Sequence, residues 1–357
     1  MSTTRRLLMP IGAIFVLVLA ACAPEPGTSP LSSEGPMGSG DAGASEQAAS
    51  GTVTVYSGRS EELVAPLLDR FTEATGIEVV ARYGDTAEMA NLILTEGENS
   101  PADVFFAQDA GALGAVAADG LLATVPDELL NAVDERFRSP SGEWVGVSGR
   151  ARVVVYNTER LTEADLPDSI SGFTDPEWDG RIGWAPTNGS FQAFVTALRV
   201  LEGEEGAREW LEGIQANNPN VYEGNNPALD AVIAGEVDVA FINHYYLMQR
   251  LEEDPGATAA NLFLTGGDPG ALVNVAGAGI LTTAPNAPAA EALVGYLLSQ
   301  EGQQYFADET KEYPLIDGVS PDPNLPPLEE IGTPEIDLSD LSDLQGTLEL
   351  LQELGIV

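Results

Sequence analysis

Hydrophobic positions along the chain follow two patterns, short apolar runs typical of buried strands and the three- and four-residue spacing of helices. Residues 53–56, 77–80 and 103–106 predict strands. Between the first two, Ser60 precedes a helix pattern that Gly76 ends. Strands and helices that alternate at this spacing predict a mainly parallel α/β sheet.

A longer β-rich run covers residues 144–156, enough to cross from one lobe of a protein to another. Its period of two places Arg150 and Arg152 on one face. A second run, 271–278, is interpreted as the returning strand. The chain is long enough to form two lobes with separate cores.

Two adjacent tyrosines, Tyr245 and Tyr246, follow the apolar run 237–242 at a predicted strand-to-helix turn, where Asn243 is expected to cap the helix. Successive side chains of a strand point to opposite faces, whereas both tyrosines can reach one site at such a turn. Open α/β sheets bind ligands at strand ends, and a helix N-terminus favours the phenolate form. The alternative is that the pair only packs.

A glycine-containing turn at 187–190 leads into a helix predicted over 191–201. Backbone N–H groups at a helix start form a general anion cradle, although most turns of this kind only cap the helix. A further short helix is predicted from Asn225 to Ala234.

The N-terminus predicts export. Arg5 and Arg6 precede an apolar run that ends in small residues before Cys22, the only cysteine of the chain. This segment resembles a bacterial lipobox, which implies a signal peptide over 1–21, cleavage before Cys22 and lipid attachment there. The alternative is an ordinary signal followed by an incidental thiol. Residues 22–51 are rich in Pro, Gly, Ser and Ala and are interpreted as a disordered tether. We therefore expect a protein anchored to the outer face of the cytoplasmic membrane.

The mature chain is strongly acidic. Removal of residues 1–21 takes away Arg5 and Arg6 and leaves 13 basic side chains against 56 acids, a formal net charge of −43. This charge argues against nucleic acid or an anionic membrane surface as the partner. We interpret the excess as a solvated surface.

No enzyme motif emerges. With His244 as the only histidine, neither a histidine-dependent triad nor an HExxH zinc site can form. No GxGxxG follows a strand and no phosphate-binding GxxxxGK[ST] loop is present. Tyrosines, arginines and turn amides remain, a set suited to binding rather than catalysis. An exported hydrolase would have only the acids to work with.

From Val53 to about Leu315 the chain resembles bacterial periplasmic ferric-ion-binding proteins, the substrate-binding components of ABC importers. The resemblance rests on eight blocks: 55–58, 100–105, 148–156, 186–189, 235–238, 242–246, 268–273 and 312–315. It implies a two-lobed α/β fold of the type II periplasmic-binding-protein kind, with a ligand cleft between lobes joined by crossover strands. The implied first lobe is 52–150 plus about 276–326, and the second is 151–275 plus about 327–357.

The resemblance also implies a site. Tyr245 and Tyr246 match the iron ligands of the family, and Fe(III) is a hard cation that prefers anionic oxygen. A synergistic anion (carbonate, phosphate or citrate) is expected at the residues that match its site in the family: Asn188, Gly189, Ser190, Asn225, Asn243 and Arg150, with Arg59, Arg152 and Ser60 as further candidates.

Two departures from the family concern the metal. The positions of its usual His and Glu ligands hold Ser60 and Gln108. Asp109, Gln108 and Tyr56 are therefore considered as replacement ligands, although core packing is an alternative for Tyr56. His244 is not at the family's histidine position, and we expect it to pack.

Together these features predict a monomeric Fe(III) receptor that delivers iron to an ABC importer permease. One alternative is a ferric chelate, such as ferric citrate, bound whole against Arg59, Arg150 and the turn amides. Another is a receptor for a small organic anion such as a phosphonate, with no metal bound by the protein.

Overall fold

The computed structural model describes residues 51–357. The predicted signal peptide, lipid attachment at Cys22 and all of the tether except Gly51 lie outside the described residues. Within them, no helix has the length and apolar character needed to cross a membrane.

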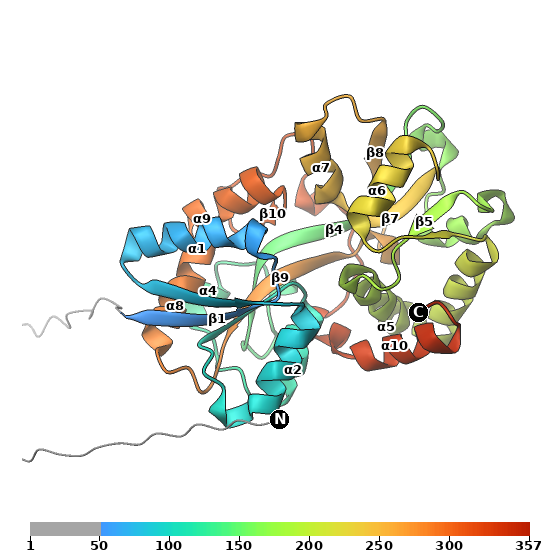
Figure 1. The fold of residues 1–357 in the computed structure, drawn as a ribbon. Coiled ribbons are helices and arrows are strands. Elements are labelled where there is room, and N and C mark those ends of the chain that lie inside the picture. The colour runs from blue at the N-terminus through green and yellow to red at the C-terminus, as the bar shows by residue number, and fades with distance from the viewer. Residues whose placement is uncertain (1–50) are drawn as a thin grey trace, which may run out of the picture. The chain divides into compact units, whose positions relative to one another are not determined.

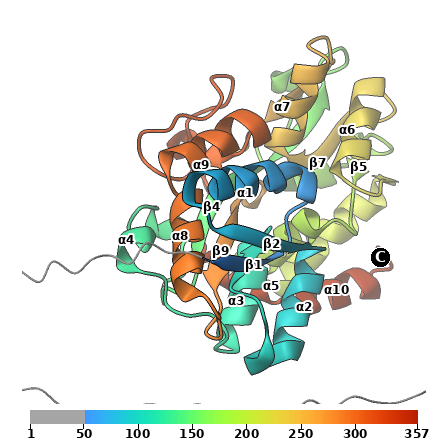
Figure 2. The same ribbon diagram turned by 60° about the vertical axis from the view of Figure 1, so that its left-hand side comes forward.

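The described strands belong to one mixed sheet in the order β2-β1-β3-β9-β4-β7-β5-β6, with β8 and β10 also paired to β4. The strands β1 (Thr52–Ser57), β2 (Glu78–Tyr83) and β3 (Val104–Ala107) run parallel. They are joined by α1 (Glu61–Thr75) and α2 (Thr86–Glu96), which lie on opposite faces of the sheet (Figures 1 and 2). Opposite faces follow from right-handed crossovers, because the chain moves outward from β1 to β2 and then returns past β1 to β3. The predicted parallel α/β start is confirmed.

One long strand connects the two parts of the sheet. β4 (Val145–Asn157) matches the run predicted over 144–156, and all of its residues are buried. Its first half pairs antiparallel with β9 (Val273–Ile280) and β10 (Tyr313–Pro314), and its second half with β7 (Val239–Asn243) and β8 (Ala259–Leu262). β9, interpreted from the sequence as the returning strand, pairs only with β3 and the first half of β4.

Two short strands complete the sheet, and helices pack around it. The strands are β5 (Ile182–Trp184) and β6 (Asn220–Val221); the helices are α3 (Ala110–Ala118), α4 (Asp127–Leu130), α5 (Gly189–Ala216), α6 (Asn225–Ala234), α7 (His244–Glu253), α8 (Ala287–Leu297), α9 (Gln300–Tyr305) and α10 (Leu344–Glu353). α5 is longer than the helix predicted over 191–201. It continues through a kink at Gly203, whose φ of 77° is a left-handed value that glycine adopts without strain.

Buried apolar side chains form three clusters, and β4 contributes to all of them. Val145, Val147 and Ala151 belong to the first cluster, together with side chains of β1, β3 and α1. From Val153 onward, side chains of β4 alternate between the other two clusters, because successive residues of a strand face opposite sides. The strand therefore changes its packing partners just after Ala151.

The C-terminal segment contacts two of these clusters. Leu338 and Leu341 belong to the first cluster, whereas Leu350 and Leu351 of α10 belong to the second. The lobe boundaries given above stay a proposal.

Candidate metal centre

The two tyrosines lie at the first turn of α7, directly after β7 ends at Asn243. Their rings stack with centroids 4.3 Å apart and an interplanar angle of 29°. Tyr245 is buried at 4% exposure, and Tyr246 is partly buried. Asn243 lies at the predicted N-cap position, but its side chain makes no capping hydrogen bond. Its Oδ1 accepts from Arg152 Nη1 at 3.2 Å instead of from a backbone N–H of α7.

Three buried guanidinium groups accompany the tyrosines. Arg59 and Arg150 are each 2% exposed and Arg152 is 4% exposed. Arg150 Nη2 donates to the carbonyl of Gln108. Arg59 Nε, Arg150 Nε and Arg150 Nη1 are buried and have no hydrogen-bond partner within the described chain. Leaving charged donors unpaired away from water costs free energy, which marks this region as suited to an anionic ligand.

Arg152 is held from several sides. It donates to the carbonyl of Phe241 at 3.0 Å and to Ser190 Oγ at 3.4 Å, and it lies 5.5 Å from the centroid of the Phe194 ring. Burial lowers the pKa of Arg152 to about 10; the neighbouring Arg150 acts in the same direction, and the nearby tyrosines oppose it. At neutral pH the guanidinium is therefore still charged.

One buried carboxylate balances part of this charge. Glu312 is fully buried and accepts from Arg59 Nη2 at 2.7 Å and from Ser148 Oγ at 2.5 Å. Although burial opposes ionisation, Arg59 and Arg150 together with these hydrogen bonds hold the pKa of Glu312 below its usual range. Neither Glu312 nor Ser148 was identified as a site residue from the sequence, although both lie in the blocks 312–315 and 148–156.

The Tyr245 hydroxyl favours the protonated form before a metal binds. Burial raises the pKa of Tyr245 far above that of free tyrosine, and the adjacent Tyr246 adds to the effect. Arg150 and Arg59 act in the opposite direction. A cation that binds here must displace the proton, and its own charge supplies the driving force.

The predicted anion cradle is a hydrogen-bonded group at the start of α5. Asn188 caps the helix, and its Oδ1 accepts from the backbone N–H of Ser190 at 3.0 Å and from Ser190 Oγ at 2.6 Å. Asn225 Nδ2 donates to Asn188 Oδ1 at 3.3 Å and to Ser190 Oγ at 3.2 Å. Through Ser190 the group reaches Arg152, so the structure connects these predicted anion residues to the arginines.

A cavity of about 640 Å³ lies beside this centre. Its walls include Thr86, Gln108, Asp109, Asn188 and Gly189, whereas the two tyrosines are not among its lining residues. The cavity wall reaches the arginines through the carbonyl of Gln108, which accepts from Arg150. Gln108 and Gly189 therefore border the cavity rather than the tyrosine rings.

Asp109 has a structural role that the sequence did not indicate. It caps α3, where its Oδ1 accepts from the backbone N–H of Ala112 at 2.9 Å. Burial raises the pKa of Asp109, although the N–H groups of the helix and Arg150 oppose this rise. One of its oxygens is thus already bonded, which weakens the case for Asp109 as a replacement ligand.

Two further candidates, Tyr56 and Ser60, have surroundings that do not favour a role as ligands. Tyr56 donates its hydroxyl to Glu96 Oε1 at 3.2 Å, and Arg82 lies 5.6 Å from the centroid of its ring. Ser60 occupies the N-cap of α1 and is exposed, and its neighbour Arg59 takes the buried position. The structure therefore favours packing for Tyr56 and gives Arg59, not Ser60, access to the centre.

His244 packs, as predicted. It is fully buried, its Nδ1 accepts from the backbone N–H of Ala151 at 3.1 Å, and its Nε2 donates to the carbonyl of Lys311 at 2.9 Å. Burial lowers the pKa of His244 to about 4, so the ring is neutral at physiological pH. With both nitrogens engaged, the imidazole has no free atom for a metal.

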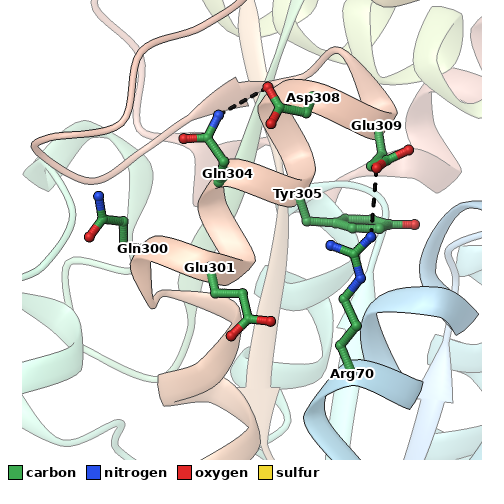
Figure 3. A pocket seen from close by; sticks show the side chains of 7 residues that line it. All are labelled: Arg70, Gln300, Glu301, Gln304, Tyr305, Asp308 and Glu309. Carbon is green, nitrogen blue, oxygen red and sulfur yellow. Dashed lines mark hydrogen bonds and ion pairs between the residues drawn. The ribbon is translucent and has the colours of Figure 1, made fainter. Parts of the chain in front are cut away.

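Other described regions of the chain show weaker signs of a metal or ligand site. Within residues 51–357, no group of three or more His, Cys, Asp or Glu side chains is arranged to hold a metal ion. Figure 3 shows a second hollow, where Arg70 pairs with Glu309 at 3.6 Å and lies over the ring of Tyr305 at 4.9 Å. None of its lining residues was predicted to belong to a site.

A mixed α/β fold with an open sheet and a polar centre at the strand ends is the architecture of periplasmic binding proteins. Residues 89–336 match the family of bacterial extracellular solute-binding proteins, and the chain belongs to this family. It is 36% identical over 309 residues to the major ferric iron-binding protein of Neisseria meningitidis serogroup B, covering 85% of this chain and 93% of the relative.

Comparison with solved structures also identifies proteins of this fold. Iron-bound HitA from Pseudomonas aeruginosa is similar with a TM-score of 0.81 and 36% identity, covering 85% of this chain and 99% of the other. The Trichodesmium protein IdiA (FutA), in complex with iron and citrate ligands, is similar with a TM-score of 0.75 and 30% identity, at 85% and 99% coverage. The predicted fold class and family resemblance are confirmed.

Proposed function

We propose that this protein is an extracytoplasmic receptor for Fe(III), with the metal bound by Tyr245 and Tyr246 and by an exogenous anion. The proposal rests on the stacked tyrosine pair, of which Tyr245 is buried and Tyr246 partly buried, beside three buried arginines. Two phenolates supply hard anionic oxygens, which Fe(III) prefers, without the redox chemistry of a thiol. The ferric-iron relatives named above support the same reading.

Charge explains why an anion is needed. Fe(III) with two phenolates carries a formal charge of +1. Arg59, Arg150 and Arg152 with the Glu312 carboxylate add a further +2. A buried centre with this excess requires an anion, because unpaired buried charge is strongly disfavoured. Carbonate, phosphate or citrate would fill the open coordination positions and accept hydrogen bonds from the unpartnered guanidinium atoms of Arg59 and Arg150.

The surrounding assembly follows from the family. The receptor is proposed to be monomeric and without enzymatic activity, and to deliver iron to an ABC importer permease. Cys22 would carry a lipid anchor on the outer face of the cytoplasmic membrane. Replacement ligands for the family's His and Glu remain a proposal as well. Gln108 and Asp109 both border the cavity beside the centre, and one oxygen of Asp109 is already bonded to the N–H of Ala112.

A second candidate is uptake of an iron chelate or of a small organic anion such as a phosphonate. The cavity of about 640 Å³ would hold the body of a chelate such as ferric citrate. The three unpartnered guanidinium atoms would suit a metal-free anion equally well. These candidates differ in whether the tyrosines bind the metal directly.

An absorption titration separates them. Ferric ion is added with carbonate or with citrate to the purified full-length chain in detergent, and the visible phenolate-to-Fe(III) charge-transfer band is recorded. The proposal expects a band with either anion. Absence of the band, together with tight calorimetric binding of a metal-free phosphonate, would favour the organic-anion receptor.

A further inference from the structure

We propose that the turn Thr310–Glu312 positions the tyrosine pair, and that His244 is the residue through which it does so. The proposal rests on the function given above, in which Tyr245 and Tyr246 bind the metal. His244 immediately precedes both tyrosines at the first turn of α7.

His244 is fixed from three directions. Its imidazole bridges the backbone N–H of Ala151 in β4 and the carbonyl of Lys311. Its own carbonyl accepts from Asn261 Nδ2 of β8 at 2.9 Å. Its ring also lies 4.8 Å from the ring of Tyr313 and 5.8 Å from that of Tyr245. A neutral, fully buried imidazole in this setting holds the backbone from which the tyrosine rings project.

The turn contacts α7 at three places along its length. Besides the bond from His244, Gln249 Nε2 donates to the carbonyl of Thr310 at 3.1 Å. Lys311 Nζ forms an ion pair with Glu252 near the end of the helix. Two consecutive residues therefore hold the tyrosine helix near its start, middle and end.

The next residue of the same turn, Glu312, contacts one of the three buried arginines. Glu312 forms a buried ion pair with Arg59 Nη2 at 2.7 Å. The turn thus contacts both the helix that carries the tyrosines and one of the three buried guanidinium groups. A shift of this turn would alter the two together.

The backbone of the turn is held in an unusual conformation. Lys311 has φ 60°, a left-handed value that a residue with a Cβ rarely adopts. It follows a π-helical turn over Phe306–Thr310, a geometry frequent at functional sites. Lys311 is also the only lysine of the chain, and its side chain is 8% exposed. Such a conformation persists where the surroundings determine it, and here they include α7.

Three substitutions of His244 separate the contact with the turn from the contact with β4. His244→Gln keeps an amide N–H near the place of Nε2 and so retains the bond to Lys311. His244→Asn keeps an acceptor near the place of Nδ1 and retains only the bond from Ala151. His244→Leu loses both. Iron dissociation from the full-length chain and the wavelength of the charge-transfer band are measured for each, with ferric ion and carbonate as the probe.

We expect His244→Gln to release iron at nearly the wild-type rate with an unshifted band. His244→Asn and His244→Leu should release it roughly tenfold faster with a shifted band, since each loses a buried hydrogen bond to the turn. Asn217→Leu serves as the matched control, because Asn217 is 3% exposed and bonds two backbone carbonyls far along the chain from α7. It should lower stability without moving the band.

Hydrogen exchange of the metal-free protein tests the turn independently of iron. In His244→Leu and His244→Asn, amides of residues 243–250 should exchange faster than in wild type, and His244→Gln should restore protection. An Asn variant that behaves as wild type while the Gln variant does not would overturn the proposal, and so would equal behaviour of all three. A wild-type chain without any charge-transfer band would instead overturn the iron function, and the exchange data would still decide the role of the turn.

Discussion

The substitution Glu312→Gln should destabilise the protein by an amount that can be worked out from the buried contacts of Glu312. Glu312 is fully buried and bonds Arg59 and Ser148 at 2.7 and 2.5 Å, and Gln preserves its volume while removing its charge. The change leaves the Arg59 guanidinium buried and uncompensated. Breaking a buried ion pair by removing one partner costs about 3–5 kcal/mol. We therefore expect the free energy of unfolding of the metal-free protein to fall by about this amount.

Urea denaturation at pH 7 measures the effect, and two controls define its cause. Glu309→Gln removes an exposed pair with Arg70, whose side chains are 57% and 44% exposed, and should cost less than about 1 kcal/mol. Arg59→Met combined with Glu312→Gln removes both charges and should cost less than Glu312→Gln alone. Equal urea midpoints for Glu312→Gln and Glu309→Gln would contradict the predicted cost of breaking the buried ion pair.

The Glu312 carboxylate also determines whether its contribution to stability rises or falls with pH. The folded pKa of Glu312 lies below its unfolded value, which is about 4.3 for glutamate. Its contribution to stability is therefore complete above that unfolded value and is lost as the pH falls through the folded pKa. The difference in the free energy of unfolding between wild type and Glu312→Gln should therefore decrease as the pH is lowered.

Three further predictions concern the metal, the packing and the surface. In the proposed site Fe(III) displaces the phenol protons of Tyr245 and Tyr246. The affinity for Fe(III) should therefore fall by up to about 100-fold per pH unit on acidification, which a competition titration against a chelator measures. Gly111→Ala should cost about 1–3 kcal/mol in urea denaturation, since an added Cβ would lie 2.3 Å from the carbonyl oxygen of Leu341; Gly295→Ala, whose nearest neighbour would be at 3.6 Å, should be nearly neutral. With 56 acids against 15 basic side chains, raising KCl from 0.1 to about 1 M should increase the urea midpoint by screening repulsion, and a midpoint that falls with salt would contradict this.

Much of the fold could be predicted from local patterns. The apolar runs at 53–56, 77–80 and 103–106 correspond to β1, β2 and β3, and the long run at 144–156 to β4, because period and length are properties of each segment alone. The extent of α5 could not be predicted in this way. Its continuation past Gly203 depends on packing of its second half against the rest of the chain, including Trp210 and Leu211 in the second cluster.

The candidate site also combines a feature that the local sequence predicts with contacts that form only in the folded chain. A turn between strand and helix brings Tyr245 and Tyr246 together locally, so adjacent residues were sufficient to predict it. Arg59 and Glu312 are separated by 253 positions and meet only in the folded chain. Asn243 was expected to cap α7, but bonding to the buried Arg152 prevails over local capping. The partners of His244 likewise come from β4 and from the turn at Lys311.

The proposed binding of Fe(III) by Tyr245 and Tyr246 can be tested directly. Ferric ion with carbonate is titrated into the wild-type chain and into Tyr245→Phe, Tyr246→Phe, the double variant and Tyr222→Phe, a tyrosine outside the centre, while the charge-transfer band is recorded. We expect a band in wild type and Tyr222→Phe, a weaker band in each single variant and none in the double variant. A band of wild-type strength in the double variant would contradict the proposal.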